Sequence, residues 1–76
     1  MEREQHTAAE IRAEVKKLFD PWGTMRKRVP QPFRVEHPEP GQPNWGMKLL
    51  RTPDRGIQAV FVAAVQDVRA RWDLKD

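Results

Sequence analysis

The sequence predicts a small single α+β domain in which two helices pack on a two-stranded antiparallel hairpin, in the order α-β-β-α. Three observations predict it: apolar residues recur at helical spacing near both ends, a proline-rich stretch between them alternates apolar and polar residues, and no long linker separates the parts. A chain of 76 residues can bury one modest core. We expect residues 1–6 to form a flexible N-terminus and residues 7–76 to form the domain.

The start of the first helix is predicted by a capping box. Thr7 and Glu10 have the Thr-x-x-Glu spacing, in which each side chain binds a free backbone N–H of the other residue. The helix should end near Phe19 or Asp20, because Pro21 disfavours helical geometry in the residue before it. The apolar stripe of this helix contains Ile11, Val15, Leu18 and Phe19.

The middle of the chain is predicted to be a hairpin. Six prolines between Pro21 and Pro43 exclude a continuous helix. Residues 33–37 and 45–50 alternate apolar and other side chains, which predicts two strands joined by a stiff loop at residues 38–44. The alternation would divide the hairpin into an apolar face and a basic face. The apolar face would contain Phe33, Val35, Trp45 and Met47, and the basic face Arg34 and Lys48.

A second, longer helix is predicted from Thr52 to Trp72. Thr52 would be its N-cap, Pro53 its first residue, and Asp54 would lie at the positive end of its dipole. Its apolar stripe contains Ile57, Val60, Phe61, Ala64, Val65, Val68 and Trp72. An alternative makes residues 57–62 a third strand, giving α-β-β-β-α. We prefer the continuous helix because the helical period extends over more residues.

Composition restricts the compartment. The chain has no cysteine, so it can form neither a disulfide nor a thiolate metal site, and it fits a reducing cytoplasm. The charged N-terminus has no apolar run behind it, which argues against a secretory signal. No segment approaches the roughly 20 apolar residues that a membrane span needs. We therefore expect a cytoplasmic protein without membrane contact.

Catalytic residue types are scarce. The chain has no serine, cysteine or tyrosine, and two of its three threonines are explained as helix caps. An acid–base pair of His6 and His37 acting on a phosphodiester is the least favoured alternative. His37, Glu36 and Glu39 lack the paired spacing of a zinc site, and the glycines form no phosphate-binding loop. We expect no enzyme activity, no cofactor, no metal and no small-molecule ligand.

Positive charge is concentrated in the middle of the chain. Seven bases and three acids lie between Gly23 and Gly56, a local balance of +4 in a chain of net charge +3. These bases could bind nucleic-acid phosphates, helped by stacking on Trp22 or Trp45 if either is exposed. No base-reading motif is present. The candidate nucleic-acid-binding residues are Arg26, Lys27, Arg28, Arg34, Lys48, Arg51 and Arg55.

A surface for a protein partner is predicted beside the apolar stripes. Leu50 and Val62 fall outside these stripes and are the candidate interface residues. The long helix also carries Ala59, Ala63 and Ala70 beside its core face, which would leave a smooth surface for another protein or a second copy of the chain. We therefore expect a non-enzymatic interaction module acting through protein–protein recognition, with homodimerisation as one form of it. Nucleic-acid binding is the alternative.

Overall fold

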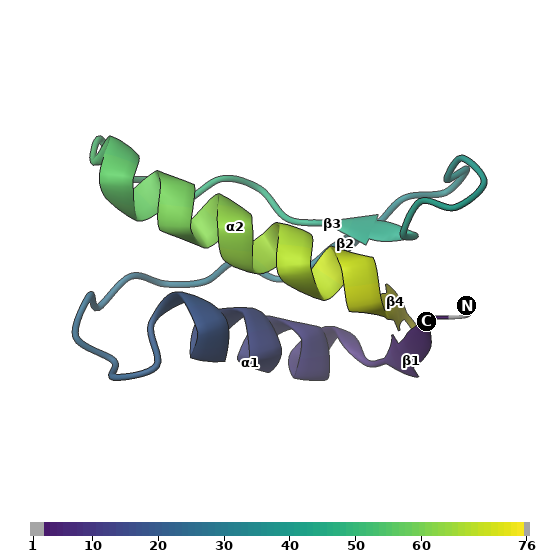
Figure 1. Ribbon diagram of the computed structural model, residues 1–76, viewed down its shortest axis with the longest axis horizontal. Helices are drawn as coiled ribbons and strands as arrows, with labels where there is room; N and C mark the ends of the chain where they lie inside the picture. The colour runs from purple at the N-terminus through teal and green to yellow at the C-terminus, as the bar shows by residue number, and fades with distance from the viewer. Residues whose placement is uncertain (1–2, 76) are drawn as a thin grey trace.

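Two antiparallel helices form the framework of the molecule. The computed structural model describes residues 3–75, in which helix α1 spans Ala8–Phe19 and helix α2 spans Arg55–Arg71. The two helices lie side by side and run in opposite directions (Figure 1). Within residues 3–75, neither helix is long and apolar enough to cross a membrane.

Two small pairs of strands complete the fold. Strands β2 (Phe33–Arg34) and β3 (Trp45–Gly46) form an antiparallel hairpin that packs against α2. Strands β1 (Glu4–His6) and β4 (Trp72–Leu74) form a parallel pair at the end of the molecule where both chain ends lie (Figure 1). The predicted α+β class and the α-β-β-α order of its main elements are confirmed. The alternative third strand is wrong, since residues 57–62 are helical.

The predicted capping box starts α1. The Thr7 hydroxyl accepts a hydrogen bond from the Glu10 N–H at 3.2 Å, and the Glu10 carboxylate accepts one from the Thr7 N–H at 2.9 Å. The helix ends where Pro21 required it, with Asp20 as its C-cap. Both ends of α1 are therefore determined by residues close to them in sequence.

Helix α2 begins later than predicted. Its N-cap is Asp54, whose carboxylate accepts a hydrogen bond from the Ile57 N–H at 3.0 Å. Thr52 instead accepts a hydrogen bond from the Asp54 N–H at 3.2 Å, so it stabilises the turn before the helix and leaves Pro53 outside it. The helix also ends earlier than predicted, because Trp72 is the first residue of β4.

The core lies between the helices and beneath the hairpin. Its centre is an edge-to-face contact between Phe19 and Phe61, with ring centroids 5.5 Å apart. Leu18 and Val60, which the spacing placed in the stripes, are exposed at the stripe edges. The buried apolar residues are Ile11, Val15, Phe19, Val29, Trp45, Leu50, Phe61, Ala64, Val65, Val68 and Leu74.

Leu50, a candidate interface residue from the sequence, is buried instead of exposed. Leu50 is only 7% exposed and belongs to the core, while Leu49 is 64% exposed. The side-chain amide of Gln58 causes this arrangement by accepting from the Leu50 N–H at 3.0 Å and donating to the Leu50 carbonyl at 2.9 Å. This pair of bonds holds Leu50 against α2, so the strand alternation does not continue to the end of the predicted strand.

The register of the hairpin differs from the predicted faces. Phe33 lies across from Gly46 and Arg34 across from Trp45. Since directly opposed residues share a face, Arg34 shares a face with Trp45, and the division into an apolar and a basic face is wrong. Trp45 is nevertheless fully buried, and its indole N–H donates to the Trp72 carbonyl at 2.9 Å. The Phe33 ring lies over Gly46, where an added β-carbon would be 3.0 Å from the ring.

Residues 4–6 form a strand, although the sequence predicted a flexible segment over residues 1–6. In the parallel pair Glu4 lies across from Trp72 and His6 across from Leu74. The His6 ring also stacks on the Trp72 indole, with centroids 3.5 Å apart. The partner strand lies at the other end of the chain, so nothing local to residues 4–6 could reveal the pairing. Residues 1–2 lie outside the described residues.

Replacing Phe61 with alanine should unfold much of the population. Phe61 is 1% exposed, and removing its ring should lower the free energy of unfolding by about 3 to 5 kcal/mol. Thermal unfolding followed by circular dichroism measures the effect. Val60→Ala, at an exposed neighbouring position, should cost about 0.5 kcal/mol or less. An unchanged melting temperature for Phe61→Ala would contradict the proposed core.

The capping box should make stability pH-dependent. Hydrogen bonding to the Thr7 N–H lowers the pKa of Glu10 below its usual 4.5. A carboxyl group with a lowered folded-state pKa stabilises the fold above its unfolded pKa, and this contribution is lost as the pH falls through the folded pKa. The melting temperature of Glu10→Gln should therefore fall less between about pH 5 and about pH 3 than that of the unmodified protein.

The exposed residue Glu36 provides the control for this measurement. Glu36→Gln should retain the full acid dependence of the melting temperature. If acidification lowers the melting temperatures of Glu10→Gln and of the unmodified protein by the same amount, the Glu10 carboxylate does not contribute to the acid sensitivity of the fold.

Candidate binding surface

The two segments of the hairpin separate beyond their paired residues. The register would place Val29 across from Leu50, but within the described part of the chain no backbone hydrogen bond joins residues 27–31 (the first arm) to residues 48–51 (the second arm). Pro30 cannot donate such a bond. The carbonyl of Val29 instead accepts from the Arg12 side chain at 2.7 Å, while Gln58 binds the backbone of Leu50.

A basic pocket of about 540 Å³ lies between the separated arms. Part of its lining is apolar or uncharged, and the remainder is cationic; no acidic residue among residues 3–75 lines it. The basic side chains are Arg12, Lys27, Arg28, Lys48 and Arg51. The other lining residues are Val29, Pro30, Gln31, Leu49 and Leu50. We call this set of residues the basic pocket.

The bases of the pocket form no ion pair with an acid of residues 3–75. The ion pairs found within residues 3–75 involve His6 and Arg71, and none includes a base of the pocket. Five like charges around a concave surface produce a positive potential that attracts anions. The pocket is therefore suited to a carboxylate, a phosphate or another anion.

The structure brings together four of the seven bases that the sequence selected. These four are Lys27, Arg28, Lys48 and Arg51, two from each arm. It adds Arg12, which sequence reasoning missed because a single base on the polar side of a helix is indistinguishable from an ordinary solvated residue. Only the contact between α1 and the first arm reveals it, through the bond from Arg12 to Val29.

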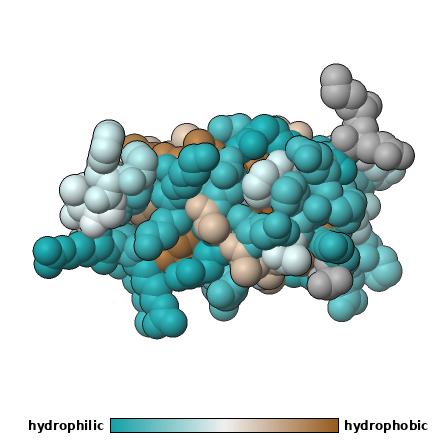
Figure 2. Space-filling view, turned by 90° about the horizontal axis from the view of Figure 1, so that it is seen from below, coloured by the Kyte–Doolittle hydropathy of each residue, from teal (hydrophilic) through white to brown (hydrophobic). Residues whose placement is uncertain are grey.

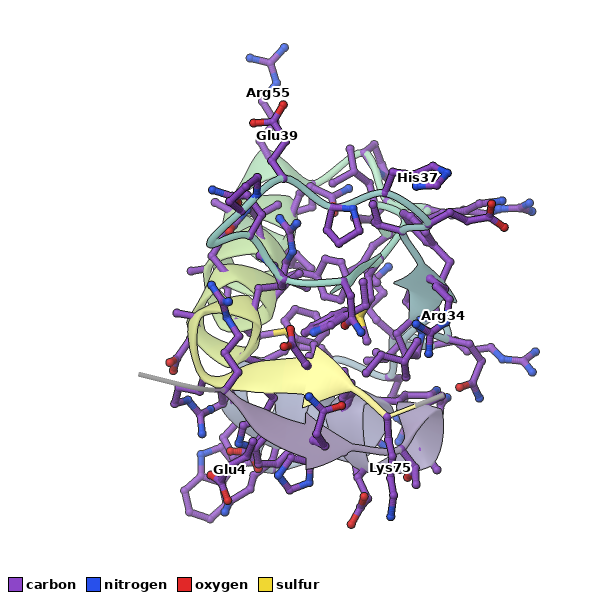
Figure 3. All side chains as sticks on the ribbon, turned by 90° about the vertical axis from the view of Figure 1, so that its right-hand side faces the viewer. Glu4, Arg34, His37, Glu39, Arg55 and Lys75 are labelled. Atoms are coloured by element: carbon purple, nitrogen blue, oxygen red, sulfur yellow. The ribbon has the colours of Figure 1, made fainter. Side chains whose placement is uncertain are left out.

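The other three selected bases do not line the pocket. Arg34 lies at the side of the hairpin, and Arg55 points away from the body of the molecule at the top of Figure 3. Arg26 is exposed in the turn before the first arm and has a positive φ of 54°. The predicted basic block is thus divided in space into one converging group and three separate residues.

The two tryptophans expected to stack on nucleotide bases, Trp22 and Trp45, do not line the basic pocket. Trp45 is buried, so it cannot stack on a base. Trp22 is exposed, but it lines a different hollow near the end of α1 with Lys16 and Lys17. No aromatic side chain is among the residues that line the basic pocket, within the chain as described.

An apolar groove of about 240 Å³ runs between the hairpin and α2. Three large side chains in it are well exposed: Phe33 at 48%, Leu49 at 64% and Val62 at 36%. Gln66 and Arg69 are its polar lining residues. The remaining lining residues are Val35, Gly46, Met47, Phe61 and Val65. We call this set the apolar groove.

The apolar groove and the basic pocket are adjacent at Leu49. Leu49 lines both hollows, and each hollow contains residues from the two separated segments of the hairpin. By contrast, the face of the molecule seen from below α1 is mostly hydrophilic (Figure 2). The exposed residues of α1 include Glu10, Lys16 and Lys17, which fit this character. The combined hollow surface on the hairpin side is therefore the candidate binding surface.

The two histidines are not brought together. His37 lies in the hairpin loop, whereas β1, which carries His6, lies at the opposite side of the view in Figure 3. The ring of His6 is occupied by stacking on Trp72, and its Nδ1 lies 3.6 Å from the Glu10 carboxylate. Residues 3–75 also contain no group of three or more acidic or histidine side chains placed to hold a metal ion.

Comparison of the chain with protein-family models, with curated proteins and with solved structures finds no match. No function can therefore be transferred from a relative. The functional argument depends on the basic pocket and the apolar groove.

Anions should stabilise the protein through the basic pocket. Sulfate at ten times its dissociation constant would add about 1.4 kcal/mol, or about 6 °C in melting temperature for a chain of this size. Thermal unfolding in sodium sulfate and in sodium chloride at equal ionic strength measures the difference. The double variant Arg28→Gln with Lys48→Gln should lose most of this sulfate-specific gain.

A matched control separates site binding from the general stabilisation that sulfate produces by exclusion from protein surfaces. Arg55→Gln removes a base that lies outside the pocket and should keep the full sulfate-specific gain. Equal gains in the double variant and in Arg55→Gln would show that the pocket does not bind the anion.

Proposed function

We propose that this protein is a non-enzymatic interaction module that binds another protein through the apolar groove. The observation that supports the proposal is the exposure of Phe33, Leu49 and Val62 together in one concave site. Solvated apolar residues are common on protein surfaces, but large ones gathered in a hollow are typical of docking sites. Of the two interface residues selected from sequence, Val62 lies in this groove.

The groove provides a modest binding energy. Covering the exposed parts of Phe33, Leu49 and Val62 would contribute roughly 3 to 4 kcal/mol before the cost of association. This energy alone cannot support a tight complex, so a stable partner must make further contacts beyond the groove. The adjacent basic pocket is the nearest place for them.

A partner other than a second copy of the chain fits this face better. A symmetric dimer uses the same patch on both subunits, so pairing at the groove would bring two basic pockets close together. Each pocket carries five bases and no acid from the described part of the chain, and like charges in an interface are unfavourable. We therefore favour a different protein over self-association. A cytoplasmic location, which the absence of cysteine favours, stays a prediction.

Nucleic-acid binding is the second candidate, favoured by the five bases of the pocket. It has less support than protein binding for two reasons. Three of the seven selected bases lie outside the pocket, and no aromatic side chain lines it to stack on a nucleotide base, among the residues that the structure describes.

Acidic substitutions in the groove should abolish partner binding. Selection from a displayed library of random peptides on the immobilised protein should enrich sequences with large apolar residues. Leu49→Glu and Val62→Glu should each lose the enriched peptides, because each buries a charge against an apolar partner. Circular dichroism should show both variants folded, since both positions are solvent-accessible.

Val60→Glu is the matched control, because Val60 is exposed on the same helix but does not line the groove. It should retain the enriched peptides. The proposal fails if no peptide is enriched, or if all three variants bind the enriched peptides equally. Sedimentation analysis tests self-association separately. If the protein is a dimer that Leu49→Glu dissociates, the partner at the groove is a second copy of the chain.

A further inference from the structure

We infer that the partner binds through an acidic, extended segment whose apolar residues occupy the groove and whose carboxylates occupy the basic pocket. This inference depends on the proposed function, because it specifies the chemistry of the segment that the groove receives. Its basis is that the two hollows meet at Leu49 and that, within residues 3–75, no base of the pocket forms an ion pair.

The two hollows follow the same pair of chain segments. On the first segment Gln31 lines the pocket and Phe33 lines the groove; on the second, Lys48 lines the pocket and Met47 the groove. Leu49 lines both. A peptide that leaves the groove along these segments therefore passes directly between the separated arms. An extended chain suits this path, because the path follows two extended segments.

The surroundings of the pocket strengthen its attraction for anions, carboxylates included. Its bases come from α1 and from both arms, so they surround an anion from several directions. Val29 and Leu50, which also line it, are buried apolar residues, and charge interactions beside apolar surface are stronger than in open water. Arg12 is held in place by its bond to the Val29 carbonyl, so part of the positive site is preorganised.

The same features favour an acidic peptide over a nucleic acid. A nucleic acid can stack a base on the exposed Phe33 ring, but it has no aliphatic side chain to cover the exposed Leu49 and Val62. A peptide can alternate apolar anchors with carboxylates at the spacing of its own residues. Arg34 and Arg55, which would extend a phosphate track, lie away from the pocket.

Fluorescent synthetic peptides test the inference. One peptide joins a block of leucine and phenylalanine to a block of aspartate and glutamate; its control carries asparagine and glutamine in place of the acids. Each peptide is made in two versions, with the polar block either before or after the apolar block. The comparison uses the version that binds more tightly. In fluorescence anisotropy at low salt, the acidic peptide should bind about tenfold more tightly, since several exposed charge pairs together reach this factor.

The preference should come from the pocket. Lys48→Gln with Arg51→Gln should reduce the acidic peptide to the affinity of its amide control. Arg26→Gln with Arg55→Gln removes the same charge from positions outside the pocket and should keep most of the preference. Raising the salt concentration should weaken the acidic peptide and leave the amide peptide nearly unchanged.

Failure of this inference and failure of the proposed function give different results. Equal binding of the acidic and amide peptides, lost in Leu49→Glu, overturns the acidic segment and leaves the groove intact. Absence of binding by both peptides counts against both proposals. If single-stranded DNA or RNA binds at low salt, depends on Lys48 and Arg51, and is not displaced by the acidic peptide, the pocket serves a nucleic acid and the inference is overturned.

Discussion

The middle of the chain is held in place by hydrogen bonds between side-chain amides and backbone groups. The hairpin has only two paired positions, and a buried backbone group without a partner is costly. The side-chain amide of Asn44 attaches one end of the segment to β4 by donating to the Leu74 carbonyl and accepting from the Leu74 N–H. Gln58 makes the equivalent pair of bonds with Leu50. These two amides attach the irregular segment to β4 and α2. The rest of the structure depends on these two attachments.

The same attachments create the candidate binding surface. Because Gln58 and Arg12 bind the two arms separately, the arms are drawn toward different helices and do not pair with each other. The space between them becomes the basic pocket. Leu50 is buried, and its neighbour Leu49 is exposed between the pocket and the groove. The stability of this proline-rich segment and the shape of the candidate binding surface therefore have a common origin in these hydrogen bonds.

The surface combines a small apolar contact with an open positive field, and the two have different consequences. Apolar contacts mainly determine how long a complex lasts, whereas complementary charge mainly raises the rate of encounter and excludes wrong partners. A groove of about 240 Å³ is small, so recognition through it suits a short segment and a reversible complex better than a permanent assembly. The groove and the pocket together would provide selectivity that neither has alone.

The sequence alone determined both helices and the α+β class, because helix period and helix caps are local. Thr7, Glu10 and Pro21 set the limits of α1, and Asp54 lay close to the predicted start of α2. Four of the five pocket bases were selected as well, from the uneven charge along the chain. Their convergence, the addition of Arg12, and the separation of Arg34 and Arg55 were beyond local reasoning.

Tertiary structure decided which neighbouring side chain faces the core wherever regular alternation ends. Leu50 is buried and Leu49 exposed because Gln58, eight residues away, binds the Leu50 backbone. Strand β1 exists because its partner is β4, at the far end of the chain. Contacts between segments distant in sequence leave no periodic signal, and the shape of the binding surface is made of such contacts.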